Sequence, residues 1–292
     1  MNVSCLKRLF CRCQRLFLAL FLAVIYAENA MDADKEIAKK FPYSEMSKNA
    51  WLPNTCATDE RVINLRKFFE VVQLSKLSNE NLLPCVACRR LSITEKSDFA
   101  LIAWVQEAKI EARRVQTMPV DLKELTRQLP TIRTMTTKDP AVFCPELCEL
   151  LANCGIAIVF LPHIGGSFLH GATFNDNSKI VMGLTVRGKD ADKFWFSLFH
   201  EIGHILLGHL NRRSEIDDAA EREADFFARD ILIPQDKFNS FVAQHNFSQD
   251  AIVSFANAVG IAPGIVVERL QKEGYLNFGW CNNLKEKYEI TA

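Results

Sequence analysis

The spacing of apolar residues along the chain changes near residue 155. In segments 59–72 and 98–115 apolar side chains recur every three to four residues, which predicts amphipathic helices. The apolar positions of the first segment are Val62, Leu65, Phe68, Phe69 and Val72. Segments 155–162 and 178–186 are short, rich in β-branched residues and bounded by Gly, Pro, Asn and Asp, so they predict strands. Segment 168–174 predicts a third strand between them.

Helical patterns return after the strands. Segment 189–210 predicts a strongly apolar helix, which Asp190 or Asp192 could cap. A second helix is predicted over 215–233, and further helices over 235–276. A few strands followed by helices predict an α+β protein, in which a small mixed or antiparallel sheet packs on the apolar helix and is embedded in additional helices.

These elements divide the chain into four predicted parts. They are a leader (residues 1–30), an N-terminal helical region (31–116), a core (117–234) and a C-terminal helical region (235–292). In the leader, four basic residues precede the apolar run 16–27, which is the pattern of a secretory signal peptide. The run is shorter than the roughly 20 residues of a membrane span. The alternative is that translation starts at Met31 and that the leader is dispensable.

Composition narrows the classes of function. Lysine and arginine number 35, as do aspartate and glutamate, so the formal net charge is zero. This balance argues against a protein that works mainly by wrapping nucleic acid. Among the ten cysteines, Cys85 and Cys88 form a C-x-x-C pair without a second pair at zinc-finger spacing, and Cys144 and Cys148 would share one helix face. We interpret these thiols as structural.

A chemical site is predicted in segment 199–209, FHEIGHILLGH. His200 and His204 are four residues apart, so on a helix both imidazoles lie on one face and can bind one metal ion. Glu201 lies one position farther round the helix, where it can act as a general base without being a ligand. Burying three titratable groups among apolar residues is costly unless they are compensated, and Zn²⁺ would compensate them.

The third metal ligand is expected from the next helix. A catalytic zinc usually has three protein ligands and one water. We expect Glu221 to complete the site, and Asp225, four residues later, to accept a hydrogen bond from a ligand histidine. Glu223 is the competing ligand, although it points about 200° away from Glu221 on a helix. His209 is expected at the helix end or in support of a ligand.

Two stretches make the sequence resemble a known family. FWFSLFHEIGHILLGH followed by EREADFFARDILIP is similar to the ImmA/IrrE family of zinc metallopeptidases. The resemblance extends over roughly residues 33–287, through FPYSEMSKNAWLP, ALIAWVQEAKIEARRV and FANAVGIAPGIVVERLQKEGYL. These segments look like the version that commonly carries an N-terminal helix-turn-helix repressor domain, although we do not expect that domain in this sequence. The family implies a zincin-like core, Zn²⁺ on His200, His204 and a glutamate of the EREAD helix, and a catalytic Glu201.

The resemblance also implies a biological role. It indicates a gluzincin-type endopeptidase that cleaves a repressor-like or antitoxin-like protein partner in gene regulation, in the cytoplasm; export is the alternative if the leader is a signal peptide. A different hypothesis is a zinc-containing regulatory module that binds a partner without cutting it. Segment 248–274 has a helix, glycine turn, helix pattern, but few basic residues flank it, so direct nucleic-acid binding is not expected. Membrane binding is expected only if the leader is an anchor.

Overall fold

The computed structural model describes residues 30–77, 86–87, 95–165, 171–185, 190–211 and 218–288. The chain divides into two compact units, Met1–Ser78 and Asn79–Ala292. Of the predicted leader, only Ala30 lies within the described residues, and Cys85 and Cys88 lie outside them. The division into four parts stays a prediction.

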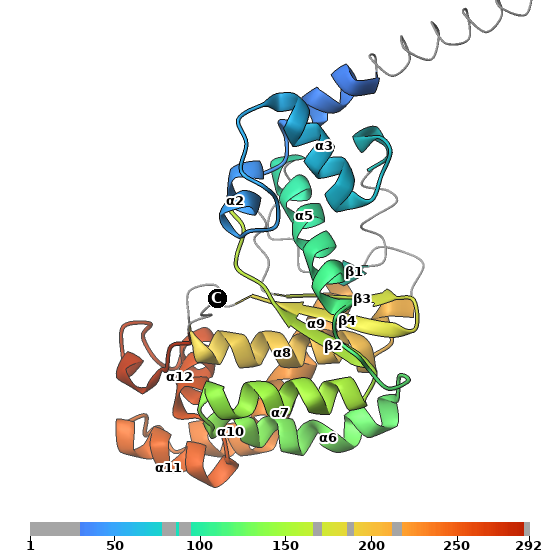
Figure 1. Cartoon of the computed structure of the whole chain (residues 1–292). Helices are drawn as coiled ribbons and strands as arrows, with labels where there is room; N and C mark the ends of the chain where they lie inside the picture. Colours follow the sequence, from blue (N-terminus) through green and yellow to red (C-terminus); the bar gives the residue numbers. More distant parts are fainter. Residues whose placement is uncertain are drawn as a thin grey trace, which may run out of the picture. The chain divides into compact units, whose positions relative to one another are not determined.

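The described part of the first unit is helical (Figure 1). It is built around the buried side chain of Asp34. Its elements are the helical residues 30–38, α2 (Tyr43–Lys48), α3 (Thr58–Phe69) and the 3-10 turn η1 (Leu74–Lys76). The carboxylate of Asp34 accepts hydrogen bonds from Arg66 Nε at 2.8 Å and from the backbone N–H of Leu74 at 2.8 Å. A buried carboxylate satisfied in this way ties the first described helix to α3 and η1.

The helix predicted over 59–72 ends earlier than expected. The positions Val62, Leu65, Phe68 and Phe69 are buried on α3, as their spacing predicts. Glu70 then adopts a left-handed conformation with φ of 56°, which ends the helix. Val72 is 86% exposed, so its assignment to the buried face was wrong.

The second unit contains a four-stranded sheet in the order β1-β3-β4-β2. Its strands are β1 (Val86–Ala87), β2 (Ile156–Phe160), β3 (Gly171–Asp176) and β4 (Lys179–Leu184). β2 runs parallel to β4, whereas β3 is antiparallel to both β4 and β1, so the sheet is mixed. Residues 168–170 of the third predicted strand lie outside the described residues.

Two helices cover opposite faces of this sheet, α5 (Glu95–Ala112) and α8 (Ala191–Leu206) (Figure 1). On the α5 face, a Cβ atom on Gly183 would lie 2.5 Å from the ring of Trp104, so only glycine allows this close approach. On the α8 face, Thr173 of β3 meets the helix. The alternation of side chains along the strands thus gives one face to each helix, and the predicted α+β fold with a mixed sheet on the apolar helix is confirmed.

Further helices complete the core around α8. They are α6 (Leu122–Thr134), the 3-10 turn η2 (Met135–Thr137), α7 (Pro140–Asn153), α9 (Asp218–Leu232), α10 (Gln235–Val242), α11 (Gln249–Val259) and α12 (Pro263–Lys272). Helix and turn signals mix over 116–140, but Asp121 caps α6 and Asp139 caps α7, with Pro140 in its first turn. Cys144 and Cys148 are partly buried on α7, and burial raises the pKa of both thiols.

The segment 276–288, which contains the 3-10 turn η5 (Asn282–Leu284), returns to the beginning of α8. The backbone N–H of Ala191 donates to Glu286 O at 3.0 Å, and Trp195 Nε1 donates to the hydroxyl of Tyr288 at 3.0 Å. Asp190 occupies the N-cap position, but its side chain pairs with Lys193 at 2.6 Å and makes no capping bond. The start of α8 is therefore fixed by the returning segment rather than by a side-chain cap.

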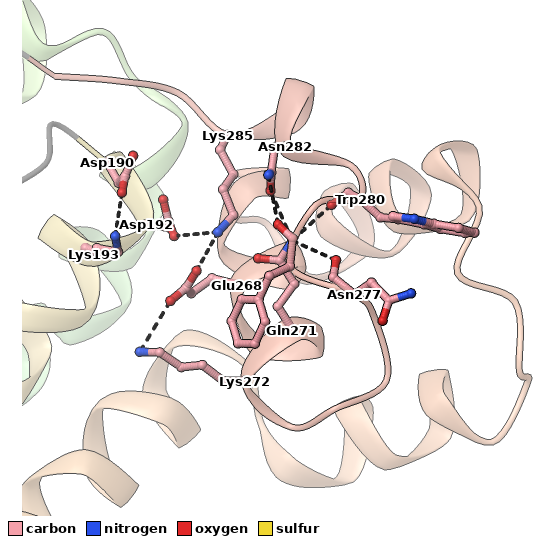
Figure 2. A network of polar contacts seen from close by, with 11 residues as sticks. Asp190, Asp192, Lys193, Glu268, Gln271, Lys272, Asn277, Trp280, Asn282 and Lys285 are labelled. Atoms are coloured by element: carbon pink, nitrogen blue, oxygen red, sulfur yellow. Dashed lines mark hydrogen bonds and ion pairs between the residues drawn. The ribbon is translucent and has the colours of Figure 1, made fainter.

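Two residues of α12 hold the returning segment (Figure 2). The amide of Gln271 donates to Trp280 O at 2.9 Å and to Asn282 Oδ1 at 3.0 Å. The ammonium group of Lys285 lies 2.5 Å from the carboxylate of Glu268 and 3.3 Å from the carboxylate of Asp192 on α8. These contacts link α12, the returning segment and α8.

In the part of the chain that the structure describes, no single helix has the length and apolar character to cross a membrane, and one pair, α11 and α12, passes that test together across a bend of 113°.

Candidate metal centre

The helix α8 presents two histidines on its buried side. The ring of His204 is fully buried and His200 is 6% exposed. Apolar residues on the remaining surface of the helix fix its position in the core: Trp195, Leu198, Phe199, Ile202 and Ile205. The spacing of four residues stacks the two imidazoles on one side, so their Nε2 atoms lie only 3.0 Å apart.

The helix α9 brings a carboxylate to the same point. Gly203 lies at the close approach of the two helices, where a Cβ atom would be a tight 3.3 Å from the backbone of Ala224. Glu221 Oε2 lies 3.3 Å from His200 Nε2, and Glu221 Oε1 lies 3.4 Å from His204 Nε2. The structure therefore brings together the three residues that the sequence nominates as metal ligands.

The geometry of these three residues fits a metal ion. Their ligand atoms all lie within 4.8 Å of one another. Two nitrogens about 2.0–2.1 Å from a tetrahedral zinc lie about 3.3 Å apart, close to the spacing of the two Nε2 atoms. Both carboxylate oxygens of Glu221 are buried without a contact of hydrogen-bond geometry, a state that a cation would relieve. Two imidazoles and one carboxylate are also a donor set of catalytic zinc sites.

Glu201 contacts the sheet and is not one of the three converging ligands. Thr173 of β3 donates its hydroxyl to Glu201 Oε2 at 2.5 Å. A Cβ atom on Gly171 would lie 2.8 Å from Glu201 Oε1, so the missing side chain makes room for the carboxylate. Burial raises the pKa of Glu201, which brings this group closer to the pKa that suits a general base near neutral pH.

The charges around His200 favour a cation. Asp225 Oδ1 lies 2.9 Å from His200 Nδ1, on the side of the ring away from Glu221. Burial lowers the pKa of His200, but Asp225 and Glu221 outweigh that effect and raise it to about 10. Burial likewise raises the pKa of Glu221, but contacts with His200 and His204 bring it down to about 2. The negative field that holds a proton on the imidazole would equally hold a metal ion in its place.

Glu223 has a different neighbour from Glu221. Its carboxylate is 54% exposed and lies 3.0 Å from His209 Nε2. His209 Nδ1 in turn lies 2.9 Å from His204 Nδ1. The structure thus places Glu221, and not Glu223, at the converging Nε2 atoms, and it places His209 beside a ligand histidine as well as at the end of the helix.

The roles of three residues in this site could not be predicted from the sequence. Gly171 and Thr173 lie within the predicted strand 168–174, but no local pattern shows that they face Glu201. The position of His209 follows from Gly208, which has φ of 74° and lets the chain turn back on α8. The glycine is visible in the sequence and signals a helix end, but the direction of the turn is not.

The helix, turn, helix pattern of segment 248–274 is part of the core. α11 and α12 are joined through Gly260, which has φ of 78°. Ala256 and Val266 are fully buried. Arg269 is 6% exposed, and its guanidinium donates to Ile233 O and Gln235 Oε1. These residues stabilise the packing of the helices, and Arg269 is not exposed to a phosphate backbone.

Comparison with known proteins identifies a family for one segment of the chain. A search of curated proteins finds no match to this chain. Residues 155–271 match the model of the peptidase M78 family, described as an IrrE N-terminal-like domain. The match runs from β2 to α12 and includes His200, Glu201, His204 and Glu221. Residues 155–271 therefore form a peptidase M78 domain of metallopeptidase type, and the resemblance to the ImmA/IrrE family is confirmed over this segment.

Proposed function

We propose that the chain is a zinc-dependent endopeptidase of the ImmA/IrrE type. The observation that carries the proposal is the meeting of His200, His204 and Glu221 at one buried point, with Glu201 on the same helix and outside the ligand set. The peptidase M78 match supports hydrolysis of a peptide bond as the reaction. The two imidazoles and one carboxylate support Zn²⁺ as the metal.

The residues of the chain then have separate tasks. His200, His204 and Glu221 hold the metal, and Asp225 orients the ring of His200 through Nδ1. Bound zinc supplies Lewis-acid polarisation of the scissile carbonyl and lowers the pKa of a water molecule to about 7. Glu201 accepts the proton of the attacking water and passes it to the leaving amine. Thr173 keeps the carboxylate of Glu201 in place between catalytic cycles.

A pocket lies between α8, α9 and α12, next to residues that support the centre. It has a volume of about 480 Å³ and is lined by residues of α8, α9 and α12. Phe196 and Phe226 give it aromatic walls, and Lys272 and Asp225 lie at its polar side. Asp225 contacts His200 at Nδ1, on the side of the ring away from Glu221, so the pocket lies behind His200. It is lined neither by the proposed metal ligands nor by Glu201, and we assign it no role in the reaction.

The partner and the compartment are proposed on family resemblance alone. Members of this type imply a repressor-like or antitoxin-like protein as substrate and action in the cytoplasm. Direct contact with nucleic acid is not part of the proposal, because Arg269 is buried and the net charge of the chain is zero.

The test uses Glu201→Gln with Glu149→Gln as the matched control, because Glu149 is an exposed carboxylate on α7. Each form is co-expressed with the product of the adjacent gene, and the partner's length is followed by immunoblot. We expect wild type and the control to shorten the partner, and Glu201→Gln to keep zinc while cleaving at least ~100-fold more slowly. An intact partner in all three strains, with zinc present in each, would support the non-cutting binding module instead.

A further inference from the structure

Three side chains form a line behind the metal centre. It begins at His204, whose Nε2 faces the metal position and whose Nδ1 faces away from it. His209 Nδ1 lies 2.9 Å from that Nδ1 atom, and His209 Nε2 lies 3.0 Å from Glu223 Oε2. His204 is fully buried and His209 is 1% exposed, so at least the first contact is shielded from water.

The positions of the hydrogens follow from the metal. A neutral imidazole that binds a metal through Nε2 carries its hydrogen on Nδ1. The Nδ1–H group of His204 therefore needs an acceptor, and His209 Nδ1 can accept only if it carries no hydrogen. The hydrogen of His209 then resides on Nε2, where the carboxylate of Glu223 accepts it. The direction of the hydrogen bond from His204 to His209 therefore determines the direction of the hydrogen bond from His209 to Glu223.

We propose that His209 and Glu223 are positioning residues that fix the tautomer and the ring orientation of His204 for metal binding. This inference rests on the proposed zinc site. The two ligand histidines are then supported differently: Asp225 contacts His200 directly at 2.9 Å, whereas Glu223 reaches His204 through the ring of His209. Partners of this kind typically change metal affinity by about 10-fold to 100-fold.

The fold provides this line through the end of α8. Gly208, with φ of 74°, turns the chain so that the 3-10 turn η4 (His209–Asn211) lies against the helix. The side chain of His209, the residue directly after Gly208, is thereby directed back to His204, five positions earlier. Glu223 comes from α9, two positions after Glu221, so it lies on a different side of that helix. One helix thus supplies both a ligand and a supporting carboxylate.

Two substitutions at residue 209 separate the acceptor from the packing. His209→Phe keeps a ring in the site but has no acceptor, whereas His209→Asn keeps an acceptor oxygen near the Nδ1 position. Zn²⁺ affinity is measured by competition with a chromogenic chelator, on the full chain and without substrate. We expect His209→Phe to bind Zn²⁺ about 10-fold to 100-fold more weakly than wild type, and His209→Asn to lie much nearer to wild type. His245→Asn, at an exposed histidine, is the control.

Glu223→Ala should have a smaller effect than His209→Phe, because water can replace a carboxylate that is 54% exposed. Thermal unfolding of each metal-free variant shows whether a loss of affinity is only a loss of fold. Equal weakening by His209→Phe and His209→Asn, in variants that both remain folded, would overturn the proposal.

A spectroscopic measurement on wild type needs no variant. Long-range ¹H–¹⁵N NMR of the histidine rings reports which nitrogen carries the hydrogen, with and without Zn²⁺. We expect the Nδ1–H form of His204 and the Nε2–H form of His209. A hydrogen on Nδ1 of His209 would overturn the positioning role whether or not the protein binds zinc. A wild-type protein that binds no Zn²⁺ would instead refute the proposed function.

Discussion

Two clusters of buried charge lie near opposite ends of α8 and are neutralised in different ways. The lysine cluster, near the start of the helix, consists of Asp192, Glu268, Lys272 and Lys285 (Figure 2). The histidine cluster, farther along, consists of His200, Glu201, His204, Glu221 and Asp225. In the first, ammonium groups of the chain lie 2.5–3.4 Å from the carboxylates. In the second, among the described residues, neither Glu201 nor Glu221 pairs with a lysine or an arginine.

The two clusters differ in the source of the positive charge that compensates their buried carboxylates. A buried carboxylate is costly unless a positive charge compensates it. Where the chain supplies that charge, as Lys285 does, the cluster is complete and joins elements of the fold. In the described part of the chain, Glu221 has only imidazoles as neighbours of this kind, so we expect its compensating charge to come from outside the chain. The histidine cluster is therefore the one that we propose to bind a metal.

The largest expected effect is loss of the metal when one ligand is removed. His204→Ala and Glu221→Gln should each weaken Zn²⁺ binding by at least about 1,000-fold, which is about 4 kcal/mol of binding free energy. Elemental analysis of the purified proteins should find about one zinc per chain in wild type and almost none in either variant. Glu149→Gln, which changes an exposed carboxylate on α7, should keep its zinc. Full zinc content in both ligand variants would refute the ligand assignment.

Removal of the internal cation should destabilise the lysine cluster. Lys285→Met leaves Asp192 and Glu268 with less compensating charge, so we expect the free energy of unfolding to fall by about 3 kcal/mol. Urea denaturation measures this change. Lys193→Met is the control, because Lys193 pairs with Asp190 at the surface and should contribute about 1 kcal/mol or less. Equal losses in the free energy of unfolding for Lys285→Met and Lys193→Met would contradict this prediction.

Metal removal should affect only the histidine cluster. Free Zn²⁺ at 100 times its dissociation constant stabilises the folded state by about 2.7 kcal/mol. A chelator should therefore lower the unfolding midpoint of wild type and of Lys285→Met, but it should leave Glu221→Gln unchanged. Differential scanning calorimetry with and without chelator checks this. A chelator effect of the same size in Glu221→Gln would place the metal elsewhere.

The smallest expected effect is a pH dependence at the lysine cluster. Burial raises the pKa of Asp192 to about 6, against the lowering effect of Lys285. Because the unfolded-state pKa is about 3.9, the folded protein binds more protons than the unfolded chain between the two values, and this group's contribution to stability falls as pH rises from about 4 to about 6. Asp192→Asn removes that slope, so its stability relative to wild type should improve over this range.

The pKa of Glu268 shifts in the opposite direction to that of Asp192: burial raises it, but hydrogen bonds with Lys285 and Asp192 outweigh that effect and lower it. Because the two shifts partly cancel, we expect a net pH effect on the order of 1 kcal/mol. Urea denaturation at pH 4, 5, 6 and 7 measures it. A constant difference between Asp192→Asn and wild type across these values would show that Asp192 does not titrate in this range.

Much of the core is predictable from local patterns. The period of apolar residues predicts α3, α5, α8 and α9, and β-branched runs predict β2 and β4. The spacing of His200 and His204 places them on one face because helix geometry alone determines this. Glu221 could be nominated since its helix follows directly. The contact of Thr173 with Glu201, by contrast, joins residues 28 positions apart and depends on how β3 packs on α8.

The lysine cluster was beyond sequence reasoning for the same reason. Asp192 has the position of a helix cap, and nothing local shows that it would be buried beneath Lys285. The family match ends at residue 271, before that lysine. Partners distant in the chain are determined by tertiary packing, whereas the metal ligands of α8 are determined by one turn of a helix.

The return of segment 276–288 to α8 has a consequence for the order of folding. The hydrogen bond between Trp195 and Tyr288 joins residues 93 positions apart. Closing a loop of that length costs more chain entropy than forming any single turn of α8, and contacts so distant in sequence slow folding. We therefore expect the first turn of α8 to be fixed only after the α9–α12 region is in place. Fragments that end after Glu221 would contain every predicted metal ligand, yet the helix that carries two of them would begin without its anchor.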